Sequence, residues 1–288
     1  MKDNPFPQSI RKVAIIAPAG PPDKEKLFRG VQLLTNLGLE VVVMPHVFAA
    51  DSSPYLSASV EKRLSDLHTA WSDDSVNLIL CARGGFGSVM LLDHINWELL
   101  RSRDVPFLGY SDITALQLAM IRECVTKPIS APMGCDITDA LTHPFTRTSL
   151  GHSLSESIAT LEVKNISYQS HTPIQSPALA ANLTVLTSLI GTAYIPDLSG
   201  TILLIEDVGE DIYKLDRALC QLRLSGLADK CQAIVFGYFK DCGTLAELDQ
   251  LSKKFADTCD VPVFCNARFG HTSETICITQ GREYSLSF

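Results

Sequence analysis

A serine placed directly after an apolar segment is the first residue of this sequence that could act as a nucleophile. Ser111 lies in the run Gly-Tyr-Ser-Asp at 109–112, after the apolar residues 106–110 and before an apolar-faced segment at 113–122. A strand, a sharp turn and a helix in this order would expose the hydroxyl beside the positive end of the helix dipole, as in a nucleophile elbow. The alternative is that Ser111 or Asp112 simply caps the helix.

A second motif is rich in glycine. The run Arg-Gly-Gly-Phe-Gly at 83–87 follows the apolar residues 76–81. Glycines let the backbone approach a ligand and present free N–H groups, which suits an oxyanion hole or a phosphate cradle. The run is not a Walker loop, because no Lys follows its last glycine, and the alternative is a tight turn between strand and helix. Arg83 is the nearest cation for a substrate carboxylate, or else it braces the glycine loop against an acid.

Carboxylates and a histidine supply the remaining chemistry. Glu206, Asp207 and Glu210 follow another apolar run, where they can bind a divalent metal, orient a histidine or cap a helix. His271 follows Phe-Gly at 269–270 in a loop after a strand, where a general base is expected, although a structural role is the alternative. The other histidines stand in polar or turn contexts. Since no two histidines have the spacing of a zinc motif, no metal is expected.

These motifs need a scaffold that brings them together, and the apolar pattern indicates one. Continuous apolar runs that alternate with helical spacing predict a parallel sheet covered on both faces. The strands are expected at 13–17, 41–44, 76–81 and 106–110, and the helices at about 22–37, 59–71, 89–92 and 113–122. In open α/β sheets, ligands bind at the carboxyl ends of the strands, which is where the four motifs lie.

The pattern changes after residue 136, which indicates a second unit. Residues 136–177 are polar and lack a strong period, and here we expect a helix at about 145–160 followed by a linker. Beyond them the sequence predicts helices at 183–189 and 215–224 and strands at 201–205, 233–237 and 261–264. We therefore expect two domains, with Ser111 in residues 1–165 and with Glu206 and His271 in residues 178–288.

Composition excludes several classes of protein. The chain has 288 residues, 46% hydrophobic and 19% charged, which is typical of a packed globular protein large enough for two domains. Its net charge of -8 without a basic block argues against nucleic acid as a partner. No run reaches the ~18 apolar residues of a membrane span, and the first apolar run is too short for a signal peptide. Nine scattered cysteines without a CxxC pair indicate reduced thiols, so we expect a cytoplasmic protein without membrane contacts.

In this order, the motifs resemble those of the LD-carboxypeptidases, the muramoyltetrapeptide carboxypeptidases of bacterial cell-wall recycling, and their microcin-immunity relatives. The resemblance runs over nearly the whole chain and is strongest at 82–88, 109–116, 206–210, 213–217, 221–222, 237–242 and 269–271. The chain has Ser-Ala-Pro-Met at 130–133 where the family often has His-Gly-Pro-Met, and Ala-Ala-Asn-Leu at 180–183 where it often has Gly-Gly-Asn-Leu. Both segments are expected to shape the substrate groove.

The resemblance implies a serine carboxypeptidase that releases the terminal D-alanine from murein tetrapeptides in peptidoglycan recycling. It implies Ser111 as nucleophile, Glu206 as triad acid and His271 as base, with the backbone N–H groups of Gly85 and Asp112 as the oxyanion hole. It also implies an α/β fold with a flavodoxin-like N-terminal domain and a smaller α/β C-terminal domain, an active site between them, a homodimer, and no metal or organic cofactor.

Three other functions remain compatible with the same motifs. The first is an immunity-type serine peptidase or amidase that hydrolyses a peptidyl-nucleotide or acyl-sulfamoyl substrate with the same triad. The second is a non-catalytic peptide-binding protein that keeps the fold. The third is an enzyme that holds a nucleotide phosphate at residues 83–87.

Overall fold

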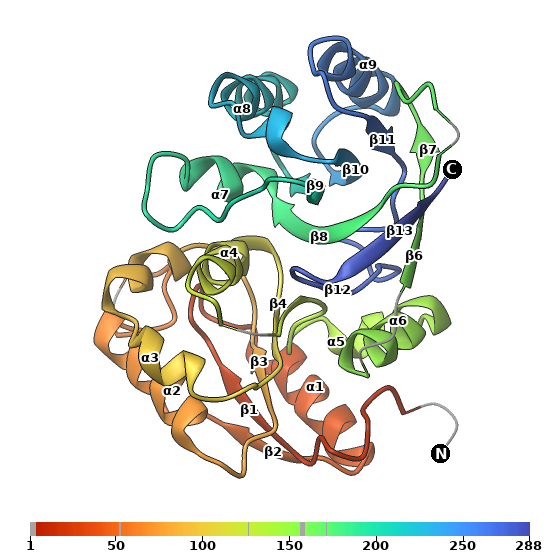
Figure 1. Cartoon of the computed structure of the whole chain (residues 1–288). Coiled ribbons are helices and arrows are strands. Elements are labelled where there is room, and N and C mark those ends of the chain that lie inside the picture. The colour runs from red at the N-terminus through yellow and green to blue at the C-terminus, as the bar shows by residue number, and fades with distance from the viewer. Residues whose placement is uncertain (1–3, 52, 126, 156–158, 171) are drawn as a thin grey trace.

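The computed structural model describes residues 4–51, 53–125, 127–155, 159–170 and 172–288. Two sheets lie one beside the other, the first built mainly from the N-terminal part of the chain and the second from the C-terminal part (Figure 1). This two-sheet α/β arrangement confirms the predicted fold class.

The first sheet has six described strands in the order β12-β5-β4-β3-β1-β2. Neighbours among β1 to β5 are parallel, and their order β2-β1-β3-β4-β5 is that of the flavodoxin-like fold. The edge strand β12 comes from the C-terminal end of the chain and pairs antiparallel with β5. The strands are β1 (Lys12–Ile16), β2 (Glu40–Val43), β3 (Leu78–Cys81), β4 (Phe107–Gly109), β5 (Pro128–Ser130) and β12 (Ile278–Thr279).

Helices cover both faces of this sheet, as the apolar pattern predicts. Helix α1 (Lys24–Asn36) lies on one side, and α2 (Val60–Ser72), α3 (Trp97–Arg101) and α4 (Thr114–Arg122) lie on the other (Figure 1). Side-chain caps fix two of the helix starts, since Asp23 accepts from Lys26 N at 2.8 Å and Ser59 accepts from Lys62 N at 3.4 Å. The segment expected as a helix at 89–92 is a 3₁₀ helix, Ser88–His94.

The second sheet has seven described strands in the order β6-β13-β8-β9-β10-β11-β7. Strands β8 to β11 are parallel neighbours, whereas β7 and β13 pair antiparallel with β11 and β8. The strands are β6 (Ala159–Glu162), β7 (Lys164–Asn165), β8 (Gln175–Asn182), β9 (Ile202–Val208), β10 (Ala233–Lys240), β11 (Val263–Cys265) and β13 (Glu283–Ser287). The helices are α5 (Ile137–Ala140), α6 (Pro144–Leu154), α7 (Leu183–Ser188), α8 (Ile212–Leu224) and α9 (Leu245–Ala256).

The stretch expected as a helix and linker differs from the prediction. The helix ends at Leu154 rather than near residue 160, residues 156–158 lie outside the described part of the chain, and Ala159 already begins β6. The expected linker also contains β7 and the start of β8. Because β6 pairs with β13, more than a hundred residues away, a partner distant in sequence stabilises it and the local pattern could not reveal it.

Both faces of the second sheet are packed. On β9, Leu203 and Ile205 belong to a core shared with the first sheet, while Ile202 and Leu204 belong to a smaller core on the opposite face. A buried hydrogen bond from Gln280 Nε2 to Gln117 Oε1, 3.0 Å long, joins the C-terminal segment to α4. No helix in the described part of the chain is long and apolar enough to span a bilayer.

Candidate active site

Ser111 occupies a sharp turn at the carboxyl end of β4. The backbone passes from an extended Tyr110 to Ser111 with φ of +62°, and a 3₁₀ turn at Ser111–Ile113 leads directly into α4. A non-glycine residue in the left-handed region stores strain of about 1–3 kcal/mol, and such strain is a common feature of functional sites. The predicted elbow is therefore present.

The glycine loop packs directly against this elbow. A Cβ atom added to Gly84 would lie 2.9 Å from Ser111 Cβ and 3.0 Å from its hydroxyl oxygen, so the close approach requires glycine. Neither the Gly85 nor the Asp112 N–H donates a hydrogen bond to any described residue. Within the described residues, both N–H groups are thus free to bind an oxygen atom of a ligand: Asp112 follows Ser111, and Gly85 follows the glycine that packs on it.

Asp112 holds the glycine loop and does not cap α4. Its buried carboxylate accepts a hydrogen bond from Ser88 N at 2.9 Å, and its backbone oxygen accepts one from the Ser88 hydroxyl at 2.5 Å. No side chain caps the 3₁₀ turn or α4, so the capping interpretation of Ser111 and Asp112 is wrong. Burial raises the pKa of the Asp112 carboxyl, and the hydrogen bonds from Ser88 oppose that shift.

A buried arginine braces the same loop from behind. Arg63 Nη1 donates to Gly87 O at 2.8 Å and to Pro18 O at 2.6 Å, and its Nε donates to Ala58 O at 3.0 Å. These bonds tie the glycine loop to the turn after β1. Burial lowers the pKa of the Arg63 guanidinium, and the charge of Asp112 opposes that shift.

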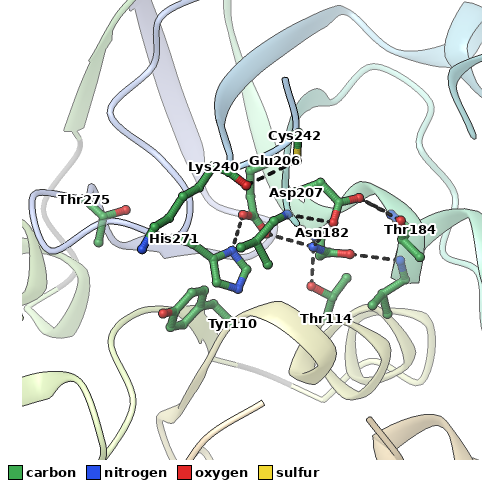
Figure 2. Close-up of polar contacts among 12 residues, drawn as sticks. Tyr110, Thr114, Asn182, Thr184, Glu206, Asp207, Lys240, Cys242, His271 and Thr275 are labelled. Atoms are coloured by element: carbon green, nitrogen blue, oxygen red, sulfur yellow. Dashed lines mark hydrogen bonds and ion pairs between the residues drawn. The ribbon is translucent and has the colours of Figure 1, made fainter. Parts of the chain in front are cut away.

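Glu206 and His271 form a buried hydrogen-bonded pair across two segments of the C-terminal part (Figure 2). Glu206 Oε2, at the end of β9, lies 2.6 Å from His271 Nδ1, and the two side chains are 1% and 16% exposed. Burial raises the pKa of Glu206, whereas the bond to His271 opposes the shift. Gly270 permits the approach, because a Cβ there would lie 3.2 Å from Glu206 Oε2. With Nδ1 bound to the carboxylate, Nε2 is the nitrogen left to exchange protons.

The two neighbouring acids have other partners. Asp207 accepts hydrogen bonds from Thr184 and from Asn182 Nδ2, the latter at 2.9 Å, whereas Glu210 lies 3.6 Å from Lys214 Nζ. Glu206, Asp207 and Glu210 therefore do not share one ligand position, which contradicts the metal-binding interpretation of these acids. Across the described residues, no group of three or more His, Cys, Asp and Glu side chains could hold a metal ion.

Ser111 and His271 are connected through Tyr110. The rings of Tyr110 and His271 lie 4.9 Å apart between centroids, and Tyr110 immediately precedes the serine. Within the described residues, no hydrogen bond joins the Ser111 hydroxyl to His271, so of the two triad contacts the structure forms only the one between Glu206 and His271 directly. Hydrogen bonds of this kind are often long or poorly aligned until a substrate is bound.

A cavity of about 330 Å³ is lined in part by His271 and is called here the His271 cavity. Its polar wall includes Tyr110, Asp136, Lys240, His271 and Thr275. The Tyr110 hydroxyl donates to Asp136 Oδ2 at 2.6 Å, and burial raises the pKa of the Asp136 carboxyl to about 6. The segment at 130–133 was expected to shape a substrate groove, and its residues 130–132 line this cavity.

Arg83 begins the glycine loop and contacts the turn after β1. Its exposed guanidinium donates from Nη1 to Pro21 O at 3.2 Å and lines neither cavity that reaches His271. It thus binds a backbone carbonyl and does not brace the loop against an acid. Its assignment to a substrate carboxylate stays a prediction.

Sequence reasoning missed several residues of this site. Asn182 Nδ2 donates to Glu206 Oε1 at 3.3 Å as well as to Asp207, while Asn182 N donates to Thr114 Oγ1 at 3.1 Å (Figure 2). The sequence marks Asn182 only as part of the segment 180–183, which is expected to shape the substrate groove. Its position between strand β8 and helix α7, where it accepts from Val185 N as an N-cap, was the available signal. Lys240 lies in the family-like segment 237–242, which suggested no role for it, and Asp136 had no motif to mark it.

The arrangement can support acyl transfer. It combines an alcohol on a strained turn, two free N–H groups beside it, and an imidazole whose remaining nitrogen can carry a proton. A carboxylate held at Nδ1 favours that tautomer and stabilises the imidazolium.

Comparisons with known proteins agree with this chemistry. Residues 13–131 match the LD-carboxypeptidase N-terminal domain and residues 175–286 match the LD-carboxypeptidase C-terminal domain. A probable murein peptide carboxypeptidase of Bacillus subtilis is 30% identical over 292 residues, which cover 98% of this chain and 91% of that protein.

Solved structures show the same fold over nearly the whole chain. The muramoyltetrapeptide carboxypeptidase of Oxalobacter formigenes is 26% identical with a TM-score of 0.84, and the match covers 95% of this chain and 94% of that one. An MccF-like protein of Bacillus anthracis is 22% identical with a TM-score of 0.83, covers 97% and 94%, and shares the fold. The chain belongs to the LD-carboxypeptidase family of serine peptidases.

Proposed function

We propose that this enzyme hydrolyses the L,D-peptide bond that releases the terminal D-alanine from murein tetrapeptides, in the cytoplasmic recycling of peptidoglycan. The observation that carries the proposal is the buried 2.6 Å pair between Glu206 and His271, whose ring lies 4.9 Å from that of Tyr110, the residue before Ser111. The names of a B. subtilis relative and an O. formigenes structural neighbour support this substrate class.

In the proposed mechanism, His271 takes the proton of the Ser111 hydroxyl as its oxygen attacks the scissile carbonyl. The N–H groups of Gly85 and Asp112 bind the oxyanion, each contributing on the order of a hundredfold in rate. His271 then gives the proton to the leaving nitrogen as the C–N bond breaks. Water hydrolyses the acyl ester by the same steps, while Glu206 keeps the imidazole oriented throughout.

The proposal includes the wider organisation of the protein. Residues 1–165 and 178–288 act as two domains that contribute the serine and the Glu206–His271 pair, respectively, and two chains form a homodimer. The proposed partner is a small peptide, with no nucleic acid, membrane or organic cofactor involved. The net charge of -8 supports the first of these exclusions.

Replacing the nucleophile tests the proposal. Ser111→Ala is expected to abolish D-alanine release while the thermal unfolding temperature stays the same, because serine and alanine carry the same backbone strain at this turn. Mass spectrometry of a defined L,D-tetrapeptide incubated with each protein gives the readout. The matched control is Ser199→Ala, at an exposed turn in which Ser199 Oγ donates to Asp197 Oδ1 at 2.7 Å. Ser111→Ala that released D-alanine at the wild-type rate would refute the nucleophile assignment.

Two further measurements separate the alternatives. A fluorophosphonate probe should label wild type and not Ser111→Ala, whereas a peptide-binding protein without catalysis would not react. A peptidyl-adenylate mimic offered beside the tetrapeptide tests the immunity-type activity, and we expect the tetrapeptide to be the faster substrate.

A further inference from the structure

The leaving residue of the substrate must lie on the histidine side of Ser111. The base that takes the serine proton later delivers it to the leaving nitrogen, so His271 stands between the nucleophile and the leaving group. The His271 cavity lies on that side, since it is lined by His271 and Tyr110 but not by Ser111 or the glycine loop. A carboxypeptidase places there a residue with a free carboxylate, which needs a cation.

Lys240 is the cation that the fold provides in this cavity. Among the described residues that line the His271 cavity, and among those lining the adjacent cavity of about 550 Å³, Lys240 is the only lysine or arginine. Figure 2 shows its side chain extending past His271, with the ammonium group in the space between Tyr110 and Thr275. Arg83, in contrast, donates to Pro21 O and lines neither of these cavities.

Strand register explains why Lys240 lies here. Lys240 ends β10, and its register partner on the parallel strand β9 is Val208, two residues after Glu206. Side chains two residues apart on a strand share a face, and register partners of parallel strands also point to the same side. The sheet therefore presents Lys240 on the face that carries the Glu206–His271 pair.

The ammonium group is available for a ligand. The exposed Lys240 side chain makes no ion pair or hydrogen bond with any described residue, although two acids line the same cavity. One of them, Asp136, is already bonded to the Tyr110 hydroxyl and to Met133 N. Because both acids repel an anion, a carboxylate that enters this cavity is held best at Lys240.

We infer that the Lys240 ammonium group binds the terminal carboxylate of the leaving residue and thereby restricts the enzyme to the end of a peptide. This inference rests on the proposed function, because it takes His271 as the group that protonates the leaving nitrogen. It assigns the substrate carboxylate to Lys240 in place of Arg83.

The test compares a tetrapeptide that ends in D-alanine with the same peptide ending in D-alanine amide. Both give the same tripeptide product, so kcat/KM for each follows from mass spectrometry of that product. Wild type is expected to prefer the acid about 10- to 100-fold, the range for a hydrogen bond to a charged partner. Lys240→Met should lose that factor on the acid alone, so that the acid-to-amide ratio falls to about one, and Lys240→Arg should restore part of it.

Two control variants accompany the test. Lys214→Met removes a lysine that pairs with Asp211 at 3.1 Å and lines neither cavity, so it should leave both substrates unaffected. Arg83→Met should keep the acid-to-amide ratio of wild type. Lys240→Met that slowed both substrates equally, or neither, would overturn the inference, as would a collapse of the ratio in Arg83→Met. Wild type that cleaved neither peptide would instead refute the proposed function.

Discussion

Replacing Glu206 by Gln exchanges one carboxylate oxygen for an amide NH2 group and tests the central hydrogen bond of the site. The carboxylate is 1% exposed and lies 2.6 Å from His271 Nδ1. A glutamine amide can donate to Nδ1, which favours the tautomer with the proton on Nε2. That tautomer cannot accept the Ser111 proton, so the base is lost even though the ring keeps its place.

The expected loss in kcat is about 10³- to 10⁴-fold, the effect of the equivalent change in other serine triads. It corresponds to about 4–5 kcal/mol of lost transition-state stabilisation, at 1.36 kcal/mol for each factor of ten. The free energy of unfolding should not fall by a similar amount, because burial already raises the pKa of Glu206 and thus opposes its charge. Catalysis and stability should therefore separate in this variant.

The assay is single-turnover release of D-alanine, with urea unfolding measured on the same protein. Glu210→Gln is the matched control, because among the described residues its carboxylate pairs only with Lys214, at 3.6 Å, and such surface pairs contribute at most about 1 kcal/mol. Its kcat should stay within twofold of wild type. Glu206→Gln with kcat within tenfold of wild type would show that the pair does not orient the base, and the proposed mechanism would have to be abandoned.

Two further variants probe the glycine loop and the His271 cavity. Gly84→Ala places a methyl group 3.0 Å from the Ser111 hydroxyl oxygen, so kcat should fall at least tenfold. The control Gly151→Ala, in which the nearest contact of the new methyl group would be 3.4 Å, should leave kcat unchanged. Equal activities of the two variants would contradict the packing argument. Asp136 has its pKa raised from 3.8 to about 6 by burial, so between these values the folded protein binds a proton that the unfolded chain has released. The free energy of unfolding therefore falls as pH rises through this window, by at most about 3 kcal/mol. Above about pH 6, Asp136 causes no further decrease. Asp136→Asn, which can still accept from Tyr110, should lose this part of the pH dependence in urea unfolding at pH 4 and pH 7. A difference in stability between wild type and Asp136→Asn that is the same at both pH values would argue against the raised pKa.

The parallel strands and the position of the elbow follow from local sequence. Residues 106–110 are apolar and end at Ser111, so both the strand and the turn after it could be predicted, within two residues at each end. Position after an apolar run made Glu206 and His271 candidates, but the family resemblance supplied their roles; in the structure Glu206 lies within β9, and His271 lies six residues after β11. Ligand residues at strand ends can be located from the sequence, because the apolar run of the strand marks where they begin.

What could not be predicted depends on contacts distant in sequence. Arg63 looks like a surface residue of an amphipathic helix, yet its guanidinium is buried because three carbonyl groups from separate loops converge on it. Lys240 and Asp136 meet in one cavity only through the pairing of strands and the path of a loop without motifs. In the described part of the chain, the short edge strand β6 likewise has β13 as its one neighbour.

The segment that carries His271 is anchored in both halves of the molecule. It leaves the second sheet at β11 and enters the first sheet at β12, which pairs with β5, and on the way Thr275 N and Cys277 N bond to Thr146 and Ser149 of α6. The position of the imidazole is therefore not fixed by one sheet alone. If the sheets rotate relative to each other, the histidine moves by an intermediate amount, so the gap to the serine changes less than the displacement of the sheets themselves. Because the segment that carries His271 is bonded to both sheets, the site tolerates small movements between the sheets. A site in which each sheet held its catalytic residue rigidly would tolerate them less well.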